Sequence, residues 1–259
     1  MFSLILSILS CAEPPTCAGA RLFGAPNERT GLDAATCAPV CEDCGGAPWS
    51  PPSYGAADFE AWRSLSHQDA PAPLTETPYG GDEPVAPGPD AVCAVILDGE
   101  GGYTTRSFES SRAAARAGGL PTHFGVCGLC SSLADLAVYA ETPDLTEPVR
   151  ACGLEHLDGD VVALTACIQA IGFTPACASI WAYNTLNTRA ECLEECLEAL
   201  DQPYHSADGA LNDCLVCDEE ESGPVFQAVA GRTRRNTGLA SSMCRPCAEV
   251  RPLTHDYRP

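Results

Sequence analysis

Cysteine is the residue type that offers this sequence most of its chemistry. The chain of 259 residues contains 17 cysteines, and eight of them form four Cys-x-x-Cys pairs, Cys41/Cys44, Cys127/Cys130, Cys214/Cys217 and Cys244/Cys247. Two thiols at this spacing can form disulfides, exchange disulfides, or supply half of a thiolate site for zinc or an iron–sulfur cluster. The compartment decides among these roles, because an oxidising compartment favours disulfides.

The N-terminal residues indicate that compartment. Phe2–Ser10 is an apolar and serine-containing run, too short to cross a bilayer but typical of the apolar region of a signal peptide. Ile8-Leu9-Ser10-Cys11 resembles the lipobox of bacterial lipoproteins, with an aliphatic residue, a tolerant position, a small residue and Cys. The resemblance covers residues 1–11 alone, and the sequence departs from the family in having no Lys or Arg before Arg21.

This resemblance implies a location. Residues 1–10 are then a signal peptide, and Cys11 is the lipidated residue that follows cleavage. Ala12 comes next, and a residue that is not acidic favours the outer membrane in the enterobacterial sorting pattern. We therefore expect a lipid-anchored protein of the bacterial outer membrane, facing the periplasm or the cell surface. The alternatives are a secretory peptide cleaved near Ala18–Ala20 and a chain that is not exported.

The charge of the chain is strongly negative. The formal net charge is −21, from 35 acidic residues against 14 basic ones, all of which are Arg. Such a surface repels phosphates, so we expect no nucleic acid partner. Solubility explains the charge, and a cationic partner is the alternative. Six arginines lie between Arg232 and Arg258, so we expect the C-terminal segment to pair with acidic helices of the fold.

The composition divides the chain into segments. Residues 11–65 form a Cys-containing irregular N-terminal segment, in which residues 58–65 are expected to be a short helix. Residues 66–91 are rich in Pro and Gly and predict an extended linker. Residues 92–259 predict a disulfide-rich helical domain. Four cysteines lie between Cys11 and the linker and twelve lie after it, as expected if each part closes its own bridges.

The domain after the linker is predicted to be mainly α with a small β-hairpin, an α+β fold. The hairpin is expected from residues 92–97 and 103–108, around the turn Asp98-Gly99-Glu100-Gly101-Gly102. Helix caps and 3.6-residue periodicity predict helices over residues 110–117, 132–140, 144–152, 160–171, 174–186, 188–200 and 224–234. Capping boxes are expected at Ser132 with Asp135 and at Thr188 with Glu191. Residues 202–223 are expected to form a polar loop.

Ten cysteines of this domain are candidates for structural disulfides: Cys93, Cys152, Cys167, Cys177, Cys192, Cys196, Cys214, Cys217, Cys244 and Cys247. We expect Cys177 to bond Cys192 or Cys196, which would lock a helical hairpin. Cys192 and Cys196 are one helical turn apart and are expected to use different partners. Leu193 and Leu197 share their helix face, which is predicted to point inward.

Cys127-Gly128-Leu129-Cys130 resembles the thioredoxin-type redox motif. It precedes a predicted helix, whose N-terminus lowers a thiol pKa, and His123 lies four residues before Cys127. The chain lacks that family's alternating βαβ pattern, and Pro148 and Pro175 are predicted helix starts and not the family's cis-proline. Thiol–disulfide exchange with Cys127, Cys130 and His123 as catalytic candidates is therefore the enzymatic alternative to structural bridging.

A metal site is the third hypothesis. Cys214, Cys217, Cys244 and Cys247 could together hold zinc or an iron–sulfur cluster, although disulfides compete for them in an oxidising compartment. The sequence shows no paired-histidine spacing, nucleophile elbow, phosphate-binding loop or dinucleotide fingerprint. We expect no cofactor and favour a non-enzymatic role. The leading hypothesis is an anchored extracytoplasmic binding or structural lipoprotein, with the membrane and an envelope or surface protein as partners.

Overall fold

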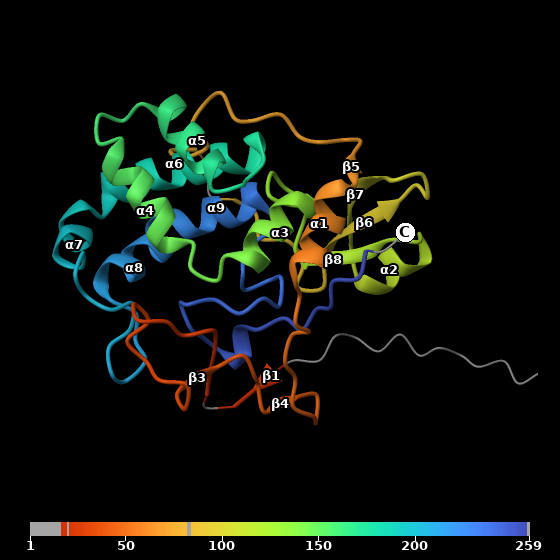
Figure 1. Cartoon of the computed structure of the whole chain (residues 1–259), viewed down its shortest axis with the longest axis horizontal. Helices are drawn as coiled ribbons and strands as arrows, with labels where there is room; N and C mark the ends of the chain where they lie inside the picture. Colours follow the sequence, from red (N-terminus) through yellow and green to blue (C-terminus); the bar gives the residue numbers. More distant parts are fainter. Residues whose placement is uncertain (1–16, 20, 82–83, 258–259) are drawn as a thin grey trace, which may run out of the picture.

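The computed structural model describes residues 17–19, 21–81 and 84–257 (Figure 1). The expected signal peptide and the expected lipidation site at Cys11 lie outside these residues. The helices are α1 (Ala56–Ser64), α2 (Ser111–Arg116), α3 (Leu133–Glu141), α4 (Thr146–Glu155), α5 (Val161–Ala170), α6 (Pro175–Glu191), α7 (Leu193–Glu198), α8 (Asp213–Cys217), α9 (Gly223–Ala230), the π-helical η1 (Asp218–Ser222) and the 3₁₀-helical η2 (Cys247–Glu249). The strands are β1 (Cys17–Ala18), β2 (Leu22–Phe23), β3 (Cys37–Ala38), β4 (Asp43–Cys44), β5 (Ser66–His67), β6 (Val92–Leu97), β7 (Gly102–Phe108), β8 (Leu120–Phe124) and β9 (Arg245–Pro246).

The expected hairpin is confirmed as β6 and β7. Its turn is fixed by Asp98, whose carboxylate accepts hydrogen bonds from the backbone N–H groups of Glu100 (2.7 Å) and Gly102 (2.9 Å). The sequence pattern did not predict β8, which pairs antiparallel with β6, or β5, which pairs parallel with β7. The result is a four-stranded sheet in the order β5-β7-β6-β8. Helix α2 packs on one face, and α1 and α3 cover the other.

A buried carboxylate joins the starts of two helices. The expected N-cap at Ser132 is confirmed, since the Asp135 N–H donates to the Ser132 hydroxyl (2.9 Å). The Asp135 carboxylate accepts from that hydroxyl (2.6 Å) and not from the Ser132 backbone N–H, so the reciprocal half of the expected capping box is wrong. Asp135 also accepts from the backbone N–H of Thr174 (2.8 Å) and from its hydroxyl (2.9 Å). Thr174 in turn caps α6, where Pro175 takes the first helical position. This network fixes α3 against α6.

Helix α6 is longer than expected and forms the centre of the helical half of the molecule. It continues to Glu191, past the predicted end at Leu186, and Cys192 then separates it from α7. Thr188 is therefore not the cap of a new helix. Its hydroxyl donates to the Asn184 carbonyl (2.9 Å), the four-residue back-bond that Thr makes inside helices. Residues 202–223, expected to be a loop, contain α8, all of η1 and the first residue of α9.

Every cysteine that the structure describes is in a disulfide. The bridges are Cys17–Cys44, Cys37–Cys244, Cys41–Cys247, Cys93–Cys127, Cys130–Cys177, Cys152–Cys167, Cys192–Cys217 and Cys196–Cys214. The protein is thus a disulfide-rich α+β fold.

Two bridges connect the ends of the chain, so the expectation that the N-terminal segment closes its own bridges is wrong. Strand β2 pairs in parallel with β3 and antiparallel with β9, which places N-terminal and C-terminal strands in one sheet. The N-terminal strands accordingly lie beside the C-terminal chain at the bottom of Figure 1. This sheet positions Cys37 near Cys244, and Cys41 near Cys247.

The predicted bridge from Cys177 to Cys192 or Cys196 is also wrong. Cys177 lies in the first turn of α6, beside the start of α3, and bonds Cys130 there. Cys192 and Cys196 lie at the other end of α6, where they bond Cys217 and Cys214. The expectation that these two cysteines use different partners is confirmed.

Residues 66–91 contain no helix where they are described, but they pack against the helical half of the molecule. The backbone N–H of Leu74 donates to the Ser179 hydroxyl (2.9 Å), and the Tyr79 hydroxyl donates to the Asn184 side chain (2.8 Å). Both acceptors belong to α6. Within the described residues, no helix has the length and apolar character needed to cross a membrane.

Candidate ligand-binding cleft

A cleft of about 500 Å³ opens in the helical half of the molecule. Its walls come from α3, α4, α6, α7, α8, η1 and α9, together with residues 233–245. Most of the lining is apolar, and its large apolar side chains are Leu145, Val149, Leu154, Leu157, Trp181, Leu193, Leu197, Leu200, Leu215, Phe226 and Met243. Its volume and lining are those of small-molecule sites, which span roughly 300–1,000 Å³.

Four leucines at the edge of the cleft are exposed to solvent. Leu154 and Leu157 lie at the end of α4 and just beyond it, with 46% and 61% of their surface exposed. Leu193 and Leu197 on α7 are 48% and 54% exposed. The expectation that the Leu193 and Leu197 face is turned into the core is therefore wrong. That face borders the cleft, because the bridges of Cys192 and Cys196 attach α7 to α8 at the side of the helical half.

Three residues that line the cleft each carry a buried polar group without a hydrogen-bond partner: the Tyr139 hydroxyl, the Trp181 indole N–H and the Thr233 hydroxyl. Tyr139 is only 1% exposed, and burial raises the pKa of its hydroxyl above the ordinary range. The indole of Trp181 is the side chain that faces this hydroxyl, but the pair lacks hydrogen-bond geometry. An unpartnered buried polar group costs about 1–3 kcal/mol of stability, so such a group in a cleft is an informative exception.

The same end of the cleft holds a positive charge. The Arg234 guanidinium lies 5.6 Å from the centre of the Tyr139 ring and donates to the backbone carbonyls of Ala240 (3.1 Å) and Thr142. Burial lowers the pKa of Arg234 to about 10, with Asp144 among the groups that favour its charge, so it stays protonated at neutral pH. Among the described residues, no carboxylate forms an ion pair with it.

The cleft is rich in arginine although the chain is acidic. Five of the 14 arginines line it, against two of the 35 acidic residues, and these arginines are Arg150, Arg189, Arg234, Arg235 and Arg245. Both lining acids are already engaged within the protein. Glu219 on η1 pairs with Arg235 and Arg245, which confirms the expected pairing of the C-terminal arginines with an acidic helix.

The second lining acid, Asp218, lies in contact with the Thr188 hydroxyl and accepts a hydrogen bond from the Asn184 amide (3.2 Å). Burial raises the pKa of Asp218. Among the described residues, Arg234 and Arg189 thus line the cleft as cations without an ion-paired acid, while the two lining acids are occupied. Arg189 donates to the His156 carbonyl (3.1 Å), whereas Arg234 is the one of the two that lies against Tyr139.

The predicted redox residues do not form a thioredoxin-like arrangement in this state. Cys127 and Cys130 do not bond each other, because Cys127 bonds Cys93 and Cys130 bonds Cys177. His123 is fully buried, with its ring nitrogens hydrogen-bonded to the Ser131 hydroxyl (2.7 Å) and the Phe124 carbonyl (2.9 Å). Burial lowers the pKa of His123 well below its usual value.

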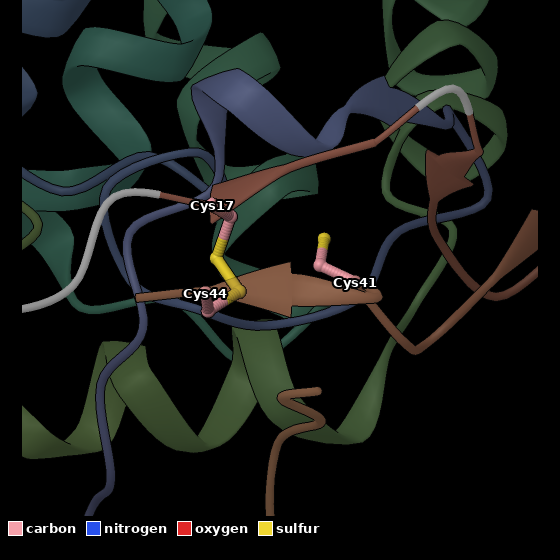
Figure 2. A group of neighbouring side chains, drawn as sticks. All are labelled: Cys17, Cys41 and Cys44. Atoms are coloured by element: carbon pink, nitrogen blue, oxygen red, sulfur yellow. A yellow bond between two sulfur atoms is a disulfide. The ribbon is translucent and has the colours of Figure 1, made fainter. Parts of the chain in front are cut away.

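The four candidate zinc ligands likewise have separate partners. Cys214 and Cys217 bond cysteines of the α6–α7 region, whereas Cys244 and Cys247 bond cysteines of the N-terminal segment. The structure instead gathers a different trio, Cys17, Cys41 and Cys44, whose sulfur atoms lie within 4.8 Å of one another (Figure 2). All three sulfurs are in disulfides, so in this oxidised state the trio consists of neighbouring bridges and offers no thiolate to a metal.

Comparison with known proteins assigns no activity to the cleft. A family model described as a family of unknown function (DUF8771) matches residues 161–252. No curated protein and no solved structure matches the chain. The matched region carries Trp181 and Arg234 but not Tyr139, which lies in α3. The cleft thus combines residues from inside and outside the matched region.

Most of the cleft residues carry no signal in the sequence that marks them as a site. Tyr139 and Trp181 lie on helices where an aromatic side chain ordinarily indicates a core position, and the sequence marks Arg234 only as part of a basic C-terminal segment. Leu193 and Leu197 were identified as one apolar face, and this was the available signal. An apolar face on a six-residue helix beside two cysteines can border a cleft as well as a core.

Proposed function

We propose that this chain is an extracytoplasmic binding protein that holds an apolar small molecule in the cleft between α4 and α7. The observation that carries this proposal is a cleft of about 500 Å³ whose exposed edge consists of leucines on both sides. Each square ångström of apolar surface that a ligand covers contributes roughly 25 cal/mol, so covering these leucines favours binding.

The bridges support a cleft that exists before a ligand binds. Cys192–Cys217 and Cys196–Cys214 tie α7 to α8, the two short helices that carry Leu193, Leu197 and Leu215. Helices this short have little stability of their own. Covalent attachment keeps their leucines in place, and a preorganised site spends less of its binding energy on ordering itself.

The disulfides also support the proposed compartment. Sixteen cysteines in eight bridges are typical of an exported protein, because the cytosol keeps thiols reduced. The lipobox resemblance at Ile8–Cys11 supports export with lipidation of Cys11. Acyl chains on that residue would anchor the protein to the outer membrane and leave the bridged domain facing the periplasm or the cell surface.

A titration with a neutral, apolar fluorescent dye such as Nile red tests the binding proposal. The parent protein is expected to bind the dye saturably with about one site per chain, and Leu197→Glu is expected to weaken binding about tenfold, because it places a charge on the leucine edge. Val162→Glu is the matched control, since Val162 is 75% exposed and does not line the cleft. Non-saturable binding, or equal losses in the two variants, would refute the proposal.

Mass spectrometry of the N-terminal peptide from native membranes tests the anchor. The expected peptide begins at Cys11 and carries the mass of the attached lipid. An unmodified peptide that begins beyond Cys11 would show that the protein is secreted without an anchor.

A further inference from the structure

We infer that the cleft takes an amphiphile with a single carboxylate head group, bound with the carboxylate at the inner end beside Tyr139 and Arg234 and the apolar chain toward the leucine edge. This inference rests on the proposed binding function and adds the chemical class and orientation of the ligand.

The unpartnered groups at the inner end require a hydrogen-bond acceptor. An indole N–H can only donate, and the hydroxyls of Tyr139 and Thr233 are free to donate as well. Aromatic contact places two of these groups together, since the ring centres of Tyr139 and Trp181 lie 6.4 Å apart. A hydrocarbon beside Tyr139 and Trp181 would leave their donors unsatisfied, whereas carboxylate oxygens accept several hydrogen bonds at once.

The charge at the inner end selects an anionic acceptor over a neutral one. Arg234 uses hydrogen bonds to two backbone carbonyls and stacks on Tyr139, but it has no acidic partner among the described residues. A guanidinium has five N–H donors, so donors remain for a ligand. A carboxylate in this partly desolvated position forms charge-assisted hydrogen bonds, which are about twice as strong as neutral ones.

The acidic residues of the lining do not oppose such a ligand. Glu219 is held in ion pairs with Arg235 and Arg245, and Asp218 is held by Thr188 and Asn184. Both lie on η1, whereas Tyr139 lies on α3 and Arg234 follows α9. The two engaged acids therefore lie on a different element from Tyr139 and Arg234, and Arg189, the other lining arginine without an ion-paired acid among the described residues, lies on α6 and donates to the His156 carbonyl (3.1 Å).

The opposite end of the cleft fits the apolar part of the ligand. Leu154 and Leu157 face the opening from α4 and its end, and Leu193 and Leu197 border it from α7. A hydrocarbon chain that leaves the inner end would cover these exposed leucines, and its far end would reach solvent. This polarity, with donors inside and apolar side chains outside, determines the direction in which the amphiphile lies.

Competition between two probes with the same chain tests the inference. Dodecanoate and dodecanol, both below their aggregation concentrations, displace the neutral dye from the full chain with its bridges intact. Dodecanoate is expected to bind at least about tenfold more tightly than dodecanol. Tyr139→Phe is expected to weaken dodecanoate about five- to tenfold and dodecanol less, because the lost hydrogen bond is stronger to a charged acceptor than to a neutral one. Arg234→Gln is expected to abolish the preference.

The outcomes distinguish the head-group inference from the proposed binding function. If dodecanoate and dodecanol displace the dye equally, or if Tyr139→Phe keeps the preference, the head-group inference is overturned while the proposed binding function stands. If neither probe displaces a saturably bound dye, the inference is likewise overturned. If the dye itself does not bind saturably, both fail. Arg234→Gln loses two backbone contacts and could misfold, but Tyr139→Phe, which loses none, still provides the test.

Discussion

Arg234 and Tyr139 pack together in the wall of the cleft, with the guanidinium carbon 5.6 Å from the centre of the ring. Neither side chain is fully satisfied within the protein, since the Tyr139 hydroxyl has no partner and Arg234 has no carboxylate among the described residues. A fold selected for stability alone has no use for a buried hydroxyl of this kind. Loss of the Tyr139 hydroxyl is therefore expected to weaken ligand binding and to stabilise the unliganded protein.

Tyr139→Phe is expected to stabilise the unliganded protein by about 1 kcal/mol, because it removes a buried polar atom that has no partner and keeps the ring. Urea unfolding with intact disulfides measures the change in the free energy of unfolding. The matched control is Tyr103→Phe, since the Tyr103 hydroxyl accepts a hydrogen bond from the Leu133 N–H (2.9 Å).

The control is expected to lose about 1–3 kcal/mol, because it leaves that buried N–H without an acceptor. If Tyr139→Phe loses as much as Tyr103→Phe, the Tyr139 hydroxyl has a structural partner and is not available for a ligand.

Arg232 is expected to be essential for folding. It is fully buried and donates to the carbonyl and hydroxyl of Thr122 (2.9 and 2.7 Å), to the Cys130 carbonyl (2.9 Å) and to the Ser131 carbonyl (3.1 Å). Arg232→Leu is expected to cost at least about 3 kcal/mol, because several buried acceptors lose their donor together. Arg116→Leu, at an exposed position on α2, is expected to change stability by less than about 0.5 kcal/mol. Equal effects of the two substitutions on the urea midpoint would contradict this role.

The two bridges that join the chain ends are expected to behave as a redundant pair. Cys37–Cys244 and Cys41–Cys247 close almost the same loop, with sequence separations of 207 and 206. Replacing either pair by Ser leaves the other to close the long loop, so each replacement is expected to cost only about 2 kcal/mol.

Replacing both pairs opens the long loop, whose effective length the internal bridges reduce. The double replacement is expected to lower the free energy of unfolding by roughly 4–5 kcal/mol more than either single replacement. A double-mutant cycle on the free energy of unfolding measures this coupling. Simple additivity of the two replacements would show that the bridges do not share one constraint.

Local signals in the sequence were sufficient for the hairpin and for most helix starts. Each of these boundaries is fixed by hydrogen bonds that span only a few residues. The residues that make them are Asp98 in the hairpin turn, Ser132 with Asp135 at the start of α3, and Thr174 before Pro175 at the start of α6. The same locality explains the wrong helix start at Thr188, where the capping pattern competes with a back-bond to Asn184 inside a longer helix.

The bridge partners and the cleft depend on contacts that no local pattern encodes. Cys37 finds Cys244 because β2 pairs with strands from both ends of the chain. Periodicity identified the apolar face of Leu193 and Leu197, but only the packing of α7 shows that the face borders a cleft. The candidate site could therefore be predicted only as a leucine face, without the polar groups opposite it.

Acid is expected to destabilise the fold through His255. Burial lowers the pKa of His255 to about 3, and its ring nitrogens are bonded to the Tyr257 hydroxyl and the Thr237 carbonyl (both 2.9 Å). Unfolded His titrates near 6.5, so the folded state disfavours the proton. The contribution of His255 is thus fully present above about pH 6.5 and is lost as the pH falls through the range from about 6.5 to 3.

The loss from one such group approaches about 1.4 kcal/mol per pH unit. Urea unfolding of the parent and of His255→Gln at several pH values between about 7 and 4 measures it. The variant is expected to show a shallower decline than the parent, although His123 still contributes to the slope in both. Parallel pH profiles would contradict the assignment.

A crystal structure of the protein with dodecanoate, crystallised at a stoichiometric ratio, tests the central claim most directly. The carboxylate is expected about 3 Å from the Tyr139 hydroxyl and beside the Arg234 guanidinium. The chain is expected between the leucines of α4 and those of α7. A carboxylate in solvent at the leucine edge, or an empty cleft with the protein saturated in solution, would contradict the claim.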